Sequence, residues 1–130
     1  MDYDDFIGNV QQYADYADGG EAESATRSTL TTLGERVTEL EAEDLAAQLP
    51  PEIGRHLTEG ESQERFDCED FLDRVADRGE RDEVASDPEN AAKAVAGTLQ
   101  EAVGGEGELA DVVNQLPQDE GYGGLFPTRQ

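Results

Sequence analysis

The sequence predicts an all-α protein, a pseudo-twofold helical bundle made of two tandem repeats of three to four helices each. Three observations support this fold class. Apolar residues recur at intervals of three and four along most of the chain, which is the spacing of one helix face. Glycine pairs and prolines stand between these stretches, where they end helices. A short set of residues then occurs a second time in the same order, which indicates an internal repeat.

The first repeat is expected to hold three helices and a final turn. The helices should cover residues 3–16, 21–39 and 42–49, and the turn residues 51–57. Asp2 can cap the first helix, and the glycine pair 19–20 should end it. The stripe of the second helix continues to Leu40. Pro50 and Pro51 stop the third helix, because proline lacks the backbone N–H that a helix interior needs.

The second repeat begins after a polar linker at about residues 58–64. Its helices should run between Asp67 and Gly79, between Asp87 and Gly104, and over residues 108–115. Asp67 with Asp70 three residues later resembles a capping box, and Asp87-Pro88 combines an N-cap with proline at the first helical position. Residues 80–86 are expected to form a charged loop.

Three residue patterns occur in both halves. Asp5-Phe6-Ile7-x-x-Val10 matches Asp70-Phe71-Leu72-x-x-Val75, Leu33 with Val37 matches Leu99 with Val103, and Gln48-Leu49-Pro50 matches Gln115-Leu116-Pro117. A unit of about 60 residues buries its apolar face poorly alone, whereas two copies can bury theirs against each other. We therefore expect one domain over residues 1–130, with repeat one at about 1–57 and repeat two at about 65–126.

These patterns resemble domain-of-unknown-function family 2267. The resemblance covers essentially the whole chain, and it is strongest over residues 3–10, 45–50, 66–75 and 112–117. It implies an all-helical, single-domain protein. It implies no activity, and the matching positions are helix starts, core residues and helix stops, so no functional residue carries over.

The charge balance is the strongest compositional signal. The chain carries 32 acidic and 9 basic residues, a formal net charge of −23, and Lys93 is its single lysine. The acids are spread over both halves rather than gathered in a tail. Such a coat repels itself at low salt, whereas about 1 M salt screens charges beyond roughly 3 Å. We interpret it as adaptation to the salt-rich cytoplasm of an archaeon. A mimic that captures basic proteins is the alternative, and we expect neither a membrane segment nor nucleic-acid binding.

Few residues are candidates for chemistry. The single histidine, His56, lies near the end of a helical turn, where a structural role is the simpler interpretation. The single cysteine, Cys68, lies in the first turn of a helix, but its acidic neighbours should raise the pKa of its thiol. Asp70, Asp73 and Asp77 share a helix face, as many acidic triplets must on this chain. We therefore expect no metal and no cofactor, and the catalytic residues, if any, stay unknown.

Three further patterns have a structural interpretation beside the functional one. Gly105-x-Gly107-x-x-Ala110 matches a loose dinucleotide fingerprint, but it follows a helix and contains glutamates, so we interpret it as a turn. Arg74, Arg78 and Arg81 are expected to pair with Asp70, Asp77 and Asp82 along their own helix. Among the tyrosines, Tyr3 and Tyr13 should lie on a buried stripe and Tyr16 should be exposed.

The sequence thus favours a non-enzymatic helical interaction module adapted to high salt, whose partner would be another protein. Two alternatives stay open: an enzyme or small-ligand site that uses carboxylates with or without a metal, and an acidic mimic or chaperone of basic proteins. The oligomeric state and the functional surface are left open by the sequence.

Overall fold

The computed structural model describes residues 2–59, 64 and 66–103 of the chain. Within this part every regular element is helical, with no strand. The elements are α1 (Tyr3–Ala14), α2 (Gly19–Arg36), α3 (Glu39–Ala47), α4 (Pro51–Gly54), the 3₁₀ helix η1 (Arg55–Thr58), α5 (Cys68–Arg78), α6 (Asp82–Ala85) and α7 (Pro88–Val103). The predicted helix at 108–115, the turn at 105–110 and the C-terminal glycines lie outside the described residues.

Side-chain caps start several of the helices, although α4 and α6 have none. Asp2 accepts a hydrogen bond from Asp5 N at 2.9 Å, and Asp67 accepts one from Asp70 N at the same distance, so both predicted caps are confirmed. Before α2, the side chain of Asp18 accepts from Glu21 N, and the Glu21 carboxylate accepts from Asp18 N in return. This reciprocal pair satisfies two backbone donors that the first helical turn leaves free.

The glycine pair 19–20 was expected to end the first helix and instead opens α2. α1 ends at Ala14, and Asp15 follows in the left-handed region with φ 59°. The capping box at Asp18 then defines the start of the next helix one residue before Gly19. The prediction was wrong because a good N-cap directly before a glycine outweighs the helix-ending tendency of glycine.

Two further boundaries differ from the sequence prediction. α2 ends at Arg36, and Thr38 caps a new helix by accepting from Glu41 N at 3.2 Å, so Leu40 belongs to α3 and is 64% exposed. Residues 80–86, expected as a loop, contain α6, whose Val84 is fully buried. Val84 thereby anchors this charged segment in the core.

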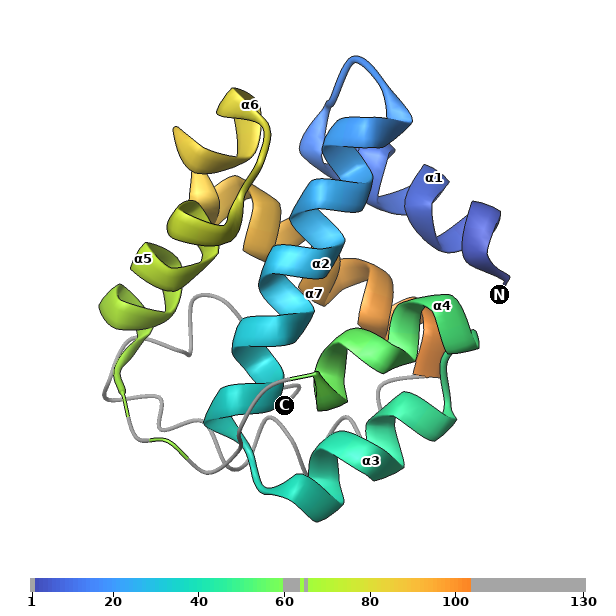
Figure 1. The fold of residues 1–130 in the computed structure, drawn as a ribbon. Coiled ribbons are helices and arrows are strands. Elements are labelled where there is room, and N and C mark those ends of the chain that lie inside the picture. The colour runs from blue at the N-terminus through green and yellow to red at the C-terminus, as the bar shows by residue number, and fades with distance from the viewer. Residues whose placement is uncertain (1, 60–63, 65, 104–130) are drawn as a thin grey trace, which may run out of the picture.

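The two long helices form the centre of the described fold. Figure 1 shows α2 passing in front of α7, with α1 on one side and α5 on the other. Each of these flanking helices contacts both long ones. α3, α4 and η1 form a second group that covers the C-terminal part of α2, and α6 joins α5 to α7.

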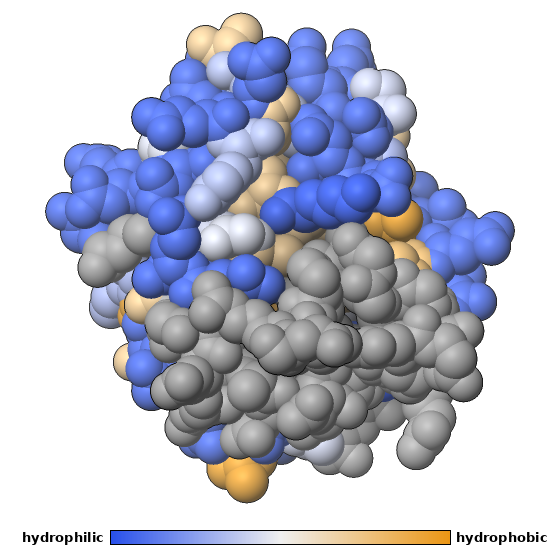
Figure 2. Space-filling model, turned by 180° about the vertical axis from the view of Figure 1, so that it is seen from behind, coloured by the Kyte–Doolittle hydropathy of each residue, from blue (hydrophilic) through white to orange (hydrophobic). Residues whose placement is uncertain are grey.

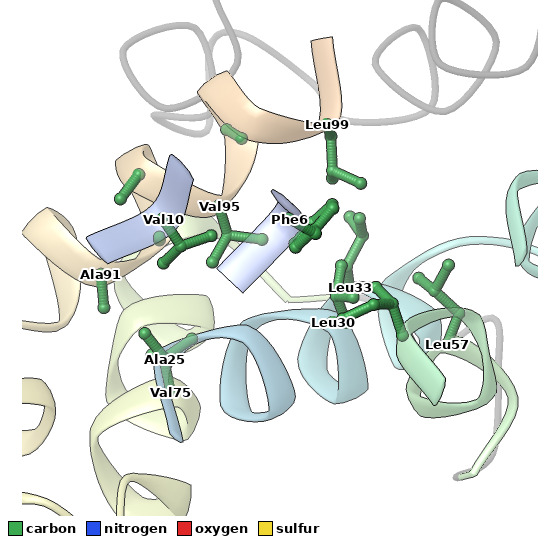
Figure 3. Packing of buried hydrophobic residues seen from close by; sticks show 14 of the residues in the cluster. Phe6, Val10, Ala25, Leu30, Leu33, Leu57, Val75, Ala91, Val95 and Leu99 are labelled. Atoms are coloured by element: carbon green, nitrogen blue, oxygen red, sulfur yellow. The ribbon is translucent and has the colours of Figure 1, made fainter. Parts of the chain in front are cut away.

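The core lies where these helices meet. Figure 3 shows Phe6 and Val10 of α1 between Leu30 and Leu33 of α2 and Val95 and Leu99 of α7. The fully enclosed large side chains include Phe6, Phe71, Leu30, Leu33, Leu45, Ile53, Leu57 and Leu99. Residues from both halves of the chain therefore share one core. Within the described residues this placement confirms most of the predicted stripe positions, whereas Leu40 and Tyr13 are exposed.

The surface is strongly hydrophilic. On the face opposite to that of Figure 1, most of the described residues are coloured as hydrophilic, with a narrow apolar strip between them (Figure 2). Among the described helices, none has both the length and the apolar character that crossing a membrane requires.

Candidate functional site on the outer face of α2

The last turns of α2 hold a buried carboxylate that gathers two arginines. Glu35 is 8% exposed, and Arg78 of α5 grips its carboxylate in a two-pronged contact, Nη1 to Oε1 at 2.8 Å and Nη2 to Oε2 at 2.6 Å. Arg74, one turn earlier on α5, donates to the same Oε1 at 3.1 Å. Arg78 Nη1 also donates to the hydroxyl of Thr32 at 2.9 Å. These contacts fasten α5 to α2.

The segment that precedes α5 is fixed to the same cluster. The guanidinium of Arg74 lies 4.0 Å from the centre of the Phe66 ring, in a cation–π contact. Nε of Arg36, itself buried, donates to the carbonyl oxygen of Phe66 at 2.9 Å. Glu64 N donates to the carbonyl oxygen of Glu35 at 2.8 Å. Glu64, at the end of the predicted linker, therefore lies against the end of α2.

The predicted pairing of Arg74, Arg78 and Arg81 along their own helix is therefore wrong. Arg74 and Arg78 pair with Glu35, and Arg81 reaches Asp18 at 3.7 Å, each across to α2 or its cap. A buried carboxylate on a neighbouring helix offers stronger pairing than exposed aspartates on the same helix, because water screens it less. The close spacing of the three arginines in the sequence indicated that they form ion pairs. Their acidic partners could not be identified from that spacing, because these partners lie on or next to α2.

Arg27 lines three hollows that lie beside α2 in the described part of the chain. The first, of about 200 Å³, is lined by Gly20, Glu23, Ser24, Arg27, Arg78, Glu80 and Arg81. The second, of about 170 Å³, is lined by Arg27, Ser28, Thr31, Glu59, Arg78 and Glu80. Because they share Arg27, Arg78 and Glu80, we treat these two as one surface, the arginine groove. Arg27 pairs across it with Glu80 at 3.5 Å, and both side chains are largely exposed.

The third hollow, of about 300 Å³, lies on the other side of α2. We call it the His56 hollow. It is lined by Tyr3, Ile7, Glu23, Thr26, Arg27, Glu52, Ile53, Arg55 and His56. Its walls therefore come from α1, α2, α4 and η1. Figure 1 shows α1 and α4 to the right of α2. A volume of this size is at the lower end of small-ligand sites.

His56 lies in η1 rather than at the end of an α-helix. The ring is buried, and its Nδ1 makes a short hydrogen bond to Oε1 of Glu59, three residues later. This pairing holds the ring in one orientation, as carboxylates often do for histidines at functional sites. The sequence placed His56 at a helix end but did not predict the carboxylate or the hollow.

Cys68 opens α5 and is partly buried. Burial, then the negative charges of Glu89 and Asp67, raises the pKa of its thiol. The predicted direction is confirmed, although the main cause is burial and one of the two charges comes from α7. The thiol is therefore a poor nucleophile at neutral pH.

Tyr3 is partly buried and packs against the core, in line with its predicted place on the stripe, whereas the other two tyrosines are placed opposite to expectation. Tyr13 is 53% exposed and donates from its hydroxyl to Glu101 of α7 at 2.6 Å, whereas Tyr16 is 9% exposed. The chain turns at Asp15 after α1, so Tyr16 leaves the helical register and points into the molecule. Among the described residues, its buried hydroxyl has no hydrogen-bond partner.

Replacing Tyr16 with phenylalanine should therefore raise the free energy of unfolding at neutral pH, by about 1 kcal/mol, because a buried unpaired hydroxyl is removed. Burial, then the charges of Asp87, Glu21 and Glu83, raises the Tyr16 pKa to about 12. An unfolded tyrosine ionises near about pH 10, so above that pH the unfolded chain loses a proton that the folded one keeps. The free energy of unfolding of the wild type should thus fall between about pH 10 and 12, and that of Tyr16→Phe should fall less steeply. Urea unfolding followed by circular dichroism at several pH values measures both slopes. An equal slope in both proteins would contradict this.

The acidic residues of the described segments form no metal site: no group of three or more histidine, cysteine, aspartate or glutamate side chains there is arranged to hold an ion. The triplet Asp70, Asp73 and Asp77 is thus not brought together with further ligands.

Residues 3–121 match a family described as uncharacterised conserved proteins, DUF2267. No curated protein matches the sequence. The match covers most of the chain, including α1 to α7. The chain therefore belongs to the DUF2267 family.

Proposed function

We propose that this protein is a non-enzymatic helical interaction module adapted to high salt, and that it binds another protein through the arginine groove on the outer face of α2. The observation that carries the proposal is the concentration of basic side chains there. Three of the nine basic residues, Arg27, Arg78 and Arg81, line this groove on a chain whose net charge is −23.

The groove has the mixture of fixed and adaptable groups that protein interfaces use. Arg78 is held by two hydrogen bonds to Glu35 and lines the groove. Within the described part of the chain, the ion pairs of Arg27 and Arg81 are long and exposed, at 3.5 and 3.7 Å. Such pairs contribute little to stability, so a partner's carboxylates can replace Glu80 and Asp18 at small cost. Arginine is also enriched among residues that dominate binding energy.

A matched pair of variants tests the groove. Arg27 and Lys93 each make one exposed ion pair of 3.5 Å, Arg27 with Glu80 and Lys93 with Glu89. Tagged wild type, Arg27→Glu and Lys93→Glu would be used as baits in multimolar KCl, with captured proteins identified by mass spectrometry and metals assayed in the same eluates. A partner retained by wild type and Lys93→Glu and lost by Arg27→Glu supports the proposal. Equal retention by both variants would place the interface elsewhere.

The high-salt part of the proposal predicts a salt-dependent fold. In about 0.1 M KCl the mutual repulsion of 32 acidic residues reaches roughly 10 Å, so the helical circular dichroism signal should collapse. It should return as KCl rises above about 1 M, and surface lysine substitutions should restore folding at low salt. A full helical signal at low salt, together with tight binding of basic proteins, would instead favour the acidic mimic. We place the protein in the cytoplasm of a salt-accumulating archaeon on the same grounds.

We also infer that the two halves are repeats related by a pseudo-twofold axis. What supports this is the symmetry of contacts: α2 packs on α7, and α1 and α5, which carry the matching Asp-Phe patterns, each pack on both. The alternative of a carboxylate-dependent enzyme gains support only from turnover that is lost when one carboxylate is replaced, or from stoichiometric metal in the eluate.

A further inference from the structure

Glu80 lies in both parts of the arginine groove. The two hollows that form the groove share three described lining residues, Arg27, Arg78 and Glu80, and Glu80 is the single carboxylate among these three. Its side chain pairs with Arg27 at 3.5 Å. An acidic group of the chain itself is therefore already seated on a basic side chain that a partner would use.

The backbone of Glu80 is fixed to α2, whereas its side chain faces the solvent. Glu80 N donates to Oγ of Ser24 at 3.1 Å. Arg78, just before it, is held by Glu35, and Val84, just after it, is fully buried. The Glu80 side chain is 76% exposed. Its carboxylate can therefore turn into the solvent while the backbone stays against α2.

The second exposed ion pair of the groove differs in this respect. Arg81 Nη1 lies 3.7 Å from Oδ2 of Asp18. The other oxygen of Asp18 accepts from Glu21 N at 3.0 Å, so this carboxylate is held in place by the helix cap. In the described part of the chain, the carboxylate of Glu80 makes only its pair with Arg27. Of the two carboxylates, Glu80 is therefore the one that a partner displaces at the lower cost.

We propose that Glu80 is an internal competitor of the binding partner, and that the partner inserts an acidic segment whose carboxylate takes the place of Glu80 on Arg27. This inference rests on the interaction proposed above for the arginine groove. In the free protein Glu80 occupies Arg27, so that the groove does not bind every acidic chain that it meets. The fixed backbone keeps this carboxylate close to Arg27, which gives it a high effective concentration there.

The occupancy of Arg27 can be measured without a partner. Phenylglyoxal modifies guanidinium groups, and it reacts more slowly with a guanidinium that is ion-paired. We would measure its rate at Arg27 in the folded full-length protein in multimolar KCl, by mass spectrometry of the peptides. Because exposed pairs are weak, Glu80→Gln should raise this rate by about twofold. The rate at Arg55, which is exposed outside the groove, should stay unchanged and serves as the internal reference.

Glu89→Gln is the matched control, because Glu89 pairs with Lys93 at the same distance of 3.5 Å and the change removes the same charge. It should leave the rate at Arg27 as in wild type. An equal rate at Arg27 in wild type and Glu80→Gln would overturn the proposal, since Glu80 would then not occupy Arg27.

The effect on binding is read from capture of the partner at increasing concentrations of bait. Glu80→Gln should reach half-capture at about half the concentration that wild type and Glu89→Gln need, because no internal carboxylate has to be displaced. A basic partner segment would give the opposite result, since it would use Glu80 and bind this variant more weakly. Unchanged or weaker capture by Glu80→Gln therefore overturns the proposal.

The Arg27→Glu variant separates this inference from the proposed interface. If Arg27→Glu loses the partner while Glu80→Gln binds it no more tightly than wild type, the groove remains the interface and only the competition by Glu80 is disproved. If Arg27→Glu retains the partner, the interface lies elsewhere and both proposals fail.

Discussion

The Gly34→Ala variant is expected to lose at least about 3 kcal/mol of unfolding free energy, the largest effect of any single methyl group in the described structure. A Cβ at Gly34 would lie 2.8 Å from the carbonyl carbon of Leu57 and closer still to its oxygen. These are backbone atoms, so η1 as a whole would have to move away from α2. That movement would expose Leu57 and Ile53, which are now 2% and 1% exposed.

Gly8→Ala is the matched control, because it adds the same methyl group to a helix interior where nothing lies within 4 Å. It should stabilise the protein by about 0.5–1 kcal/mol, since alanine restricts the unfolded chain more than glycine does. Urea unfolding in multimolar KCl, followed by circular dichroism, measures both. If Gly34→Ala unfolded at the same urea concentration as wild type, the close approach of η1 to α2 would be disproved.

Glu35→Gln should cost about 2–3 kcal/mol of unfolding free energy, the second large effect. The substitution keeps the shape of the side chain but removes the charge that Arg74 and Arg78 share. Breaking a buried pair on one side is expensive because the remaining charges lose their partner without regaining full hydration. The estimate is below the value for fully enclosed pairs, since both arginine side chains are 34% exposed.

Glu80→Gln is the control for Glu35→Gln. Its pair with Arg27 is exposed on both sides, so the change should stay within about 0.5 kcal/mol. Raising KCl should shrink the Glu80 effect further and leave most of the Glu35 effect, because salt screens buried pairs much less. Equal costs for the two variants would show that the Glu35 cluster does not fasten α5 to α2.

The fold class followed from local signals in the sequence. The three- and four-residue spacing of Phe6, Ile7 and Val10 marks a helix face, and all three side chains are buried in α1. The caps at Asp2 and Asp67 and the stop at Pro50 depend on contacts within a few residues, so the chain specifies them without reference to the rest of the fold. The match to the DUF2267 family agrees with the resemblance carried by the same residues.

The errors at Tyr16 and Val84 share one physical origin, which is competition that only the tertiary structure resolves. Tyr16 was expected to be exposed at the end of the first helix, but the left-handed turn at Asp15 directs it into the core from outside α1. The segment containing Val84 looks like a charged loop, yet burial of that one side chain holds a helical turn in place. In both cases a contact with a distant part of the chain outweighs the local preference.

By itself, then, the sequence determined the helices, most of their buried faces and the acidic character of the surface. The tertiary structure alone decided which charges meet. Glu35 lies 39 residues from Arg74 and 43 from Arg78, and the His56 hollow draws its walls from four elements. Helix periodicity and capping depend on residues a few positions apart. An ion pair between helices, or a hollow lined by several elements, depends on how whole helices pack, and no local pattern in the sequence specifies that packing.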